Sequence, residues 1–196
     1  MKKIASIFFI ILLGSTANLF SDDNQSIKRI FEGEENAKIT IIAYESLTCG
    51  HCADFHKNVY PDLKKDFIEK GLVKIEFRHF PLDIAAFNAS KIGQCNNDGD
   101  PNVLNILFLG QKKWARGKTP EEATKYLKKF LEDEGVNLDF EKCLNNKSIE
   151  DYVLNDRIEG VKKFEVNATP TIIINDKKFD KALNYKNLKK YLEKLI

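Results

Sequence analysis

The chain has 196 residues, of which 43% are hydrophobic and 31% charged, enough apolar material for the core of one domain or of a domain with an insertion. This balance argues against a disordered or low-complexity chain. Loss of Lys2 and Lys3 with an N-terminal leader would lower the basic residues from 31 to 29, equal to the 29 acidic residues, so charge does not favour nucleic acid or an anionic membrane as a partner.

The N-terminus has the residue order of a secretory signal peptide. Two lysines are followed by an apolar run from Ile4 to Leu13 and then by small residues up to Ala17. The apolar run is shorter than the roughly 20 residues that span a membrane, so we expect cleavage after Ala17, with Ser21 as a second candidate end. Residues 1–17 are therefore predicted to be a signal peptide.

Residues 18–36 are predicted to form a polar N-terminal arm. Its one short apolar piece, Ile27 to Phe31, is suited to pair as an edge strand. The arm is too short to make a dimerisation domain, so we expect a monomer.

Residues 37–82 are predicted to form a strand, a helix and a second strand, as the first part of the domain. Ala37 to Tyr44 reads as a buried strand, and Leu72 to Phe80 is the next strand. The helix between them should end at Gly71 and kink at Pro61, because proline removes a backbone hydrogen bond and clashes with the preceding turn. A helical crossover makes the two strands parallel. Apolar residues recur every four positions along this helix, at Phe55, Val59, Leu63 and Phe67.

Two cysteines lie where the first strand gives way to the helix. Cys49 falls at the helix start, where unpaired backbone N–H groups and the positive end of the helix dipole stabilise a thiolate. Cys52 lies one turn further on the same face, so it can attack a mixed disulfide at Cys49. The imidazole of His51 would further stabilise the thiolate and favour the reduced dithiol. The spacing therefore predicts a redox-active pair.

The alternative for two cysteines at this spacing is half of a zinc site. Zinc usually takes four ligands, and Cys95 and Cys143 come singly, without a second close pair or two suitably spaced histidines. We therefore expect no metal. His56 is predicted to be an ordinary exposed helix residue without a role.

Residues 83–160 are predicted to form an all-helical insertion, and residues 161–196 the second part of the domain. Thr119 and Pro120 have the chemistry of a helix start, and Trp114 is expected to pack in the core rather than contact a substrate. The last segment is predicted to contain, in order, a strand up to Ile174, a turn at Asn175 and Asp176, a short strand from Lys177 to Asp180 and a helix from Tyr185 to Ile196.

The chain resembles thioredoxin-fold proteins at Cys49-Gly50-His51-Cys52 and, far downstream, at Ala168-Thr169-Pro170-Thr171. The helical insertion between these motifs is similar to that of the DsbA-like periplasmic disulfide oxidoreductases, and the resemblance covers nearly all of the mature chain. It implies an α/β thioredoxin fold with an all-helical insertion between the second and third core strands.

The resemblance also implies how the substrate is held. In the family, the proline that matches Pro170 is cis and faces the disulfide, and the backbone of the preceding residue, here Thr169, pairs with the substrate peptide. Weaker similarities to the family lie at Arg78 to Asp83 and at Gln111 to Trp114.

The chain departs from the family at two places. Gly50-His51 is more similar to protein disulfide isomerases than to the best-known bacterial oxidase. Ala43 stands six residues before Cys49, where thioredoxins carry a buried carboxylate that helps to move a proton from the second cysteine. Glu45 lies nearby but closer to the loop, and we expect it to be solvated. The group that relays the proton of Cys52 therefore stays open.

The motif and the resemblance together predict a periplasmic thiol:disulfide oxidoreductase that donates its Cys49–Cys52 disulfide to secreted proteins, with Cys49 as the attacked sulfur. No cofactor is required, and the resemblance implies reoxidation by a quinone-linked membrane partner of the DsbB type. One alternative is a disulfide isomerase or reductase of the same fold, which Gly50-His51 and Thr169 favour and the missing dimerisation domain disfavours. Others are a non-catalytic substrate-holding module and a glutathione-dependent isomerase of related fold, which usually has serine in place of the redox pair.

Cys95 and Cys143 are expected to form a second, structural disulfide between the two ends of the insertion. In an exported chain with four cysteines these two remain once the redox pair is set aside, and some DsbA-like proteins that this chain resembles carry such a bridge. Two separate buried thiols are the alternative.

Overall fold

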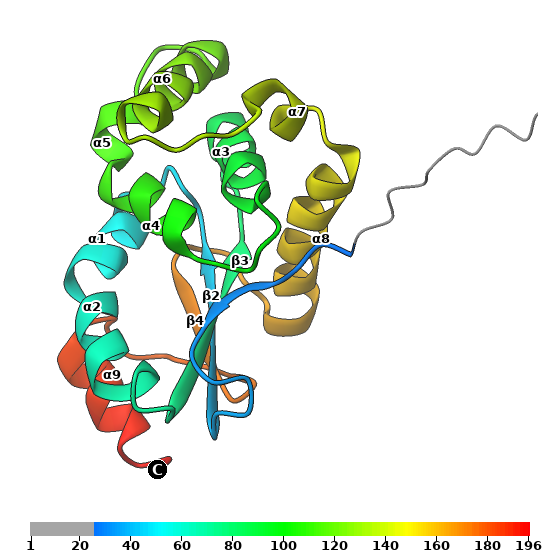
Figure 1. Cartoon of the computed structure of the whole chain (residues 1–196). Coiled ribbons are helices and arrows are strands. Elements are labelled where there is room, and N and C mark those ends of the chain that lie inside the picture. The colour runs from blue at the N-terminus through cyan, green and yellow to red at the C-terminus, as the bar shows by residue number, and fades with distance from the viewer. Residues whose placement is uncertain (1–25) are drawn as a thin grey trace, which may run out of the picture.

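A computed structural model describes residues 26–196 (Figure 1). The predicted signal peptide and its cleavage sites at Ala17 and Ser21 lie outside the described residues. Within residues 26–196, no helix combines the length and the apolar character needed to cross a membrane.

A five-stranded mixed sheet forms the centre of the fold, in the order β1-β3-β2-β4-β5. The central strands β2 and β3 are parallel, and the other neighbouring pairs are antiparallel. The arm supplies β1 at one edge, as its apolar piece predicts. The strands are β1 (Ile30–Glu32), β2 (Ile39–Glu45), β3 (Val73–His79), β4 (Thr171–Ile174) and β5 (Lys177–Lys178).

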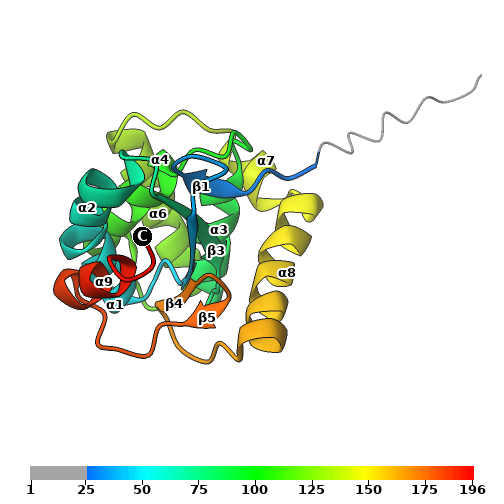
Figure 2. The same ribbon diagram turned by 90° about the horizontal axis from the view of Figure 1, so that it is seen from below.

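Helices cover both faces of this sheet. Figure 2 shows α8 on one side and α1, α2 and α9 on the other, and Figure 1 shows the insertion helices around the end of the sheet where β2 meets α1. The helices are α1 (Gly50–Asn58), α2 (Tyr60–Leu63), the π-helical turn η1 (Lys64–Ile68), α3 (Ile84–Gln94), α4 (Asn102–Leu109), α5 (Gln111–Trp114), α6 (Pro120–Asp133), α7 (Phe140–Leu144), α8 (Lys147–Phe164) and α9 (Tyr185–Leu192). The predicted fold class, a thioredoxin fold with a helical insertion between the second and third core strands, is confirmed.

The first crossover helix is broken where proline predicts a kink. Helix α1 ends at Asn58, Val59 leaves helical geometry, and Pro61 lies in the first turn of α2, where its missing N–H costs nothing. The chain continues through η1 to Ile68. The break separates the segment that carries the cysteines from the rest of the crossover.

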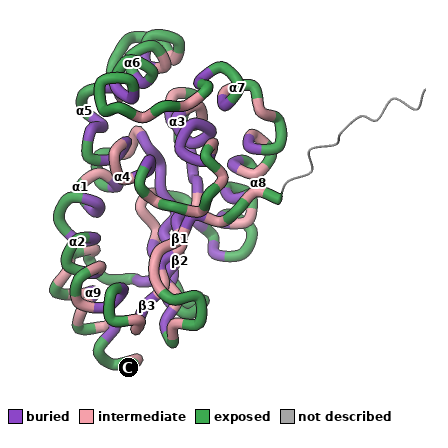
Figure 3. The backbone as a smooth tube through the Cα atoms, viewed as in Figure 1, coloured by how far each residue is buried: buried purple, intermediate pink, exposed green. Residues whose placement is uncertain are grey.

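The core lies between the sheet and the helices, as the purple segments of Figure 3 show. Alternate residues of β3 are buried, as expected for a strand with one more exposed face. Trp114 is fully buried, and its indole N–H donates to the Leu107 carbonyl at 2.8 Å. Its predicted packing role is therefore confirmed.

A buried carboxylate joins the arm, the sheet and α8. Asp156 on α8 accepts hydrogen bonds from the Arg29 guanidinium at 2.5 Å and from the backbone N–H of His79 at 3.0 Å. The Arg78 guanidinium lies 3.6 Å from the same carboxylate. Because a buried charge is tolerated only when it is paired, this cluster fixes α8 on its face of the sheet.

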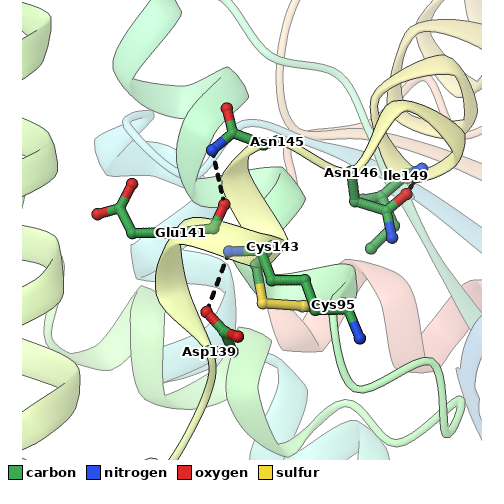
Figure 4. The surroundings of a disulfide bond; sticks show 8 residues. Cys95, Asp139, Glu141, Cys143, Asn145, Asn146 and Ile149 are labelled. Carbon is green, nitrogen blue, oxygen red and sulfur yellow. Dashed lines mark hydrogen bonds between the residues drawn. A yellow bond between two sulfur atoms is a disulfide. The ribbon is translucent and has the colours of Figure 1, made fainter.

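Cys95, at the end of α3, forms a disulfide with Cys143 of α7, 48 residues further along the chain (Figure 4). Their Cα atoms are 5.5 Å apart. Both helices belong to the insertion, and Cys143 is buried in the main core. We propose that this bridge is structural.

Replacing Cys95 and Cys143 together with alanine is expected to lower the melting temperature markedly. A disulfide that closes a loop of this length contributes roughly 4 kcal/mol in the chain-entropy model. Thermal unfolding followed by circular dichroism measures the loss. Iodoacetamide reactivity of Cys49 serves as the control and should stay within about twofold of the wild type; a large change would give the bridge a role at the redox pair.

Candidate active site

The cysteine pair sits where strand β2 passes into helix α1. β2 ends at Glu45, and a loop follows. The last residue of this loop, Cys49, is the N-cap of α1 and has an extended backbone. The side chain of Cys49 is partly exposed, whereas that of Cys52 is fully buried one turn further on. Both are free thiols in this structure. The pair therefore presents one sulfur to solvent and keeps the other inside.

The surroundings of Cys49 stabilise its thiolate. The Cys52 thiol donates a hydrogen bond to the Cys49 sulfur, which is the largest of the causes that lower the pKa of Cys49 from 9.0 to about 5. Burial opposes this shift, and the Thr169 side chain and the backbone N–H groups of Cys52 and His51 reinforce it. At neutral pH the exposed sulfur is therefore a thiolate.

The pKa of Cys52 moves the other way. Burial is the largest cause that raises it, and the hydrogen bond to Cys49 and the negative charge of Glu45 add to this. The backbone N–H of Ser46 donates to the Cys52 sulfur and opposes the rise. Cys52 therefore holds its proton in the dithiol form.

Thr169 and Pro170 lie directly beside the exposed sulfur. The peptide bond between them is cis, as the resemblance implies. In its thiol form Cys49 donates to the Thr169 carbonyl at 3.3 Å, and the buried Thr169 hydroxyl has no partner among residues 26–196, so it is free to donate to the thiolate. His51, which is exposed, shares with Thr169 and Pro170 the lining of a cleft of about 490 Å³. The structure thus brings the sequence-predicted site residues together.

Gln111 holds the cysteine loop from the insertion. Its side-chain amide donates to the carbonyls of Leu47 and Cys49, both at 2.9 Å. The weak family similarity around Gln111 is the signal that could have identified this role. A second link joins the Thr48 hydroxyl to the Asp83 carboxylate at 2.7 Å. The helical insertion therefore helps to position the cysteine loop.

Two predictions about side chains near the pair are wrong. Glu45, expected to be solvated, is 4% exposed, and His56, expected to be an exposed helix residue, is 2% exposed. His56 Nε2 lies 2.9 Å from Glu45 Oε2, and His56 Nδ1 lies 2.8 Å from Asn105 Oδ1. Helix α4 of the insertion supplies Asn105 and covers this corner, which the sequence of β2 and α1 alone does not reveal.

The arrangement of the two sulfurs is suited to thiol–disulfide exchange. A thiolate attacks a disulfide, and a low-pKa thiolate is also a good leaving group. No group of three or more His, Cys, Asp or Glu residues is placed to hold a metal in the described part of the chain. Fold and site together define a thioredoxin-fold protein with a redox-capable dithiol.

The chain belongs to the thioredoxin family, since the family model with that description matches residues 25–194, and within it to the DsbA-like proteins. Wolbachia pipientis alpha-DsbA1 is 29% identical, with a TM-score of 0.76 over 87% of this chain and 92% of that one. Disulfide bond formation protein D of Bacillus subtilis is 27% identical over 83% of this chain and 74% of its own length. A Rickettsia conorii protein named as a protein-disulfide oxidoreductase is 26% identical over 79% of this chain and 54% of its own.

The present chain thus spans about half the length of the Rickettsia relatives it matches.

Proposed function

We propose that this protein is a periplasmic thiol:disulfide oxidoreductase that acts mainly as an oxidase and donates its Cys49–Cys52 disulfide to secreted proteins. The observation that carries the proposal is that the pKa values of the two thiols shift in opposite directions. The pKa of Cys49 falls to about 5, while that of buried Cys52 rises. A stabilised thiolate favours the reduced form of the pair. The disulfide form is then a strong oxidant.

In the proposed reaction a client thiolate attacks Cys49, the half-exposed sulfur. The bond between Cys49 and Cys52 breaks, and its electron pair passes to Cys52, which takes up a proton. A second client thiolate then attacks the client sulfur of the mixed disulfide, and Cys49 leaves as a stable thiolate. The client gains a disulfide and the enzyme is left as a dithiol.

The site residues have separate roles in this reaction. The thiolate of Cys49 draws support from the N–H groups at the start of α1, to which His51 contributes its backbone and, we propose, its imidazole. Thr169 and Pro170 are proposed to bind the client, because both line the cleft and the Thr169 carbonyl lies beside the reactive sulfur. Reoxidation is assigned to a quinone-linked membrane partner of the DsbB type. Reduced secreted proteins are the proposed clients, and the protein is proposed to act as a monomer.

A disulfide isomerase or reductase is the second candidate function. Gly50-His51 between the cysteines and Thr169 before Pro170 favour it. Three assays run side by side separate the candidates: oxidation of a reduced dithiol peptide, reduction of insulin and rescue of scrambled ribonuclease. We expect rapid peptide oxidation with slow insulin reduction. Rapid insulin reduction with slow peptide oxidation would support the reductase instead, and efficient ribonuclease rescue would support the isomerase.

Replacing Thr169 with valine is expected to raise the pKa of Cys49. Valine keeps the shape of the side chain but cannot donate a hydrogen bond to the thiolate, and such a bond to an ionised group is worth about 1.5–3 kcal/mol. Thiolate absorbance titrated against pH measures the shift. Thr169→Ser, which keeps the hydroxyl, is the matched control, and its Cys49 should titrate like that of the wild type. An unchanged pKa of Cys49 in Thr169→Val would show that the Thr169 hydroxyl does not stabilise the thiolate.

A further inference from the structure

A buried carboxylate and a buried imidazole lie near the cysteine pair. Glu45 closes strand β2, and His56 lies one turn after Cys52 on helix α1. The two side chains are 2.9 Å apart. The His56 ring stacks on Phe108, with ring centroids 4.1 Å apart, and contacts Phe77 and Tyr60. These aromatic rings keep bulk water away from the pair.

The contacts of His56 define where its protons lie. Asn105 Oδ1 can only accept, so His56 Nδ1, 2.8 Å away, carries a hydrogen. One further proton lies between His56 Nε2 and Glu45 Oε2, whether it is bound to the imidazole or to the carboxyl. The other carboxyl oxygen of Glu45, Oε1, is buried and has no hydrogen-bond partner among residues 26–196. The pair thus holds a shared proton and offers a free acceptor atom.

Cys52 lies one helical turn before His56 on α1, so the two side chains share a face of that helix and Cys52 lies next to the pair. Its sulfur accepts the backbone N–H of Ser46, the residue that follows Glu45, and the charge of Glu45 contributes to the raised pKa of Cys52. Glu45 also acts on Tyr60 of α2, but the Tyr60 hydroxyl donates to Glu32. Helix α4 carries no charged residue, and its polar contact with the pair is the neutral Asn105. Among the described residues, Glu45 is therefore the carboxylate placed to exchange a proton with Cys52.

We propose that Glu45, positioned by His56, gives a proton to the Cys52 sulfur when the enzyme disulfide opens and takes it back when the disulfide forms again. The inference rests on the proposed function for its place in the reaction. As the client sulfur bonds to Cys49, the S–S bond breaks, its electron pair passes to Cys52, and a proton held on Glu45 Oε1 moves to that sulfur, which leaves Oε1 without a partner as in the dithiol structure. In the reverse direction Cys52 returns the proton to Oε1 as it attacks the mixed disulfide, and the proton shared with His56 stays in place.

The proton balance of client oxidation is complete without a further group. Two client thiols lose two protons and two electrons. The electrons reduce the enzyme disulfide, Cys52 takes the proton that Glu45 held, and both client protons are released to solvent because Cys49 remains a thiolate. Glu45 regains its proton from Cys52 when the disulfide forms again. His56 acts as a positioning residue, since it hydrogen-bonds to the Glu45 carboxyl group.

The test isolates the step in which Cys52 loses its proton. Reduced protein is mixed with oxidised glutathione in a stopped-flow instrument: the first, second-order step is attack by Cys49, and the plateau rate at high glutathione is attack by Cys52 on the mixed disulfide. Glu45→Gln is expected to lower the plateau rate at pH 7 by about 100-fold or more and to leave the second-order rate unchanged. Glu45→Asp should restore part of the loss.

Asp156→Asn is the matched control. It also removes a buried carboxylate, but one on α8, which packs against Arg29 and the backbone of His79 and is not among the leading causes of the raised pKa of Cys52. This variant is expected to melt at a lower temperature and to keep both rates near those of the wild type. A plateau rate in Glu45→Gln within about twofold of the wild type would overturn the proposal. Equal loss of both rates would overturn it as well, because it would indicate a structural role.

The result of this stopped-flow test does not depend on whether the protein oxidises clients. If the wild type fails to oxidise clients but Glu45→Gln still slows the plateau rate alone, the proposed function is wrong and the proton transfer between Glu45 and Cys52 is still supported. If Glu45→Gln does not fold, His56→Gln provides the second measurement, with an expected loss of about tenfold or more in the plateau rate only. An unchanged plateau rate in that variant would overturn the proposal.

Discussion

Replacing Cys52 with alanine is expected to turn the protein into a trap for its clients. Cys49 keeps its half-exposed position beside the cleft, so its thiolate still attacks client disulfides and forms mixed disulfides, but the sulfur that would displace the client is gone. Release then depends on an external thiol and should be slower by several orders of magnitude. Non-reducing gels and mass spectrometry of protein recovered from cells would show the adducts.

Cys49→Ala is the matched control for the trap. It removes the half-exposed sulfur and leaves only Cys52, which is 0% exposed and cannot meet a client. No adducts are expected from this variant, and its exchange activity should be abolished. Adducts on Cys52 in the Cys49→Ala protein would reverse the order of attack that the burial of the two sulfurs indicates.

The reduced protein is expected to show a thiolate that titrates near pH 5. The pKa of Cys49 is lowered from 9.0 to about 5, first by the hydrogen bond from Cys52. Because the folded pKa lies below the unfolded one, the thiolate stabilises the folded reduced form fully above pH 9, and this stabilisation is lost as the pH falls through about 5. The excess stability of the reduced form over the disulfide form should therefore grow from pH 5 to pH 9.

Thiolate absorbance near 240 nm measures this titration, and thermal unfolding of the reduced and oxidised forms across the same pH range measures its consequence. Cys49→Ala, which lacks the thiolate, is the control for both. A titration midpoint near the ordinary pKa of a cysteine thiol would contradict the expected strong oxidising power. So would a reduced form that is less stable than the disulfide form at pH 7.

The regular parts of this fold can be predicted from the sequence because local patterns determine them. The isoleucine-rich strand before the cysteines, the break at Pro61 and the turn at Asn175 and Asp176 all depend on near neighbours in the chain. The redox pair is also local, since two residues of spacing at a helix start place both sulfurs. The fold class follows from these elements together with the family resemblance.

The surroundings of Cys52 depend on contacts between distant segments. Glu45 at the end of a strand reads as a solvated residue, and only the Asn105 helix, which the chain reaches 60 residues later, buries it against His56. The two hydrogen bonds from Gln111 to the cysteine loop are equally long-range. Polar residues that are buried by a distant insertion carry no local hydrophobic pattern, so periodicity does not identify them.

The reduction potential of the Cys49–Cys52 pair tests the central claim most directly. The protein is equilibrated with glutathione buffers of graded ratio, and the fraction of free Cys49 is measured by alkylation and mass spectrometry, with Cys95 and Cys143 held in their bridge. An oxidase with this stabilised thiolate should lie between about −180 mV, typical of an isomerase, and about −120 mV, typical of the strongest bacterial oxidase. A value near −270 mV, typical of thioredoxin, would contradict it.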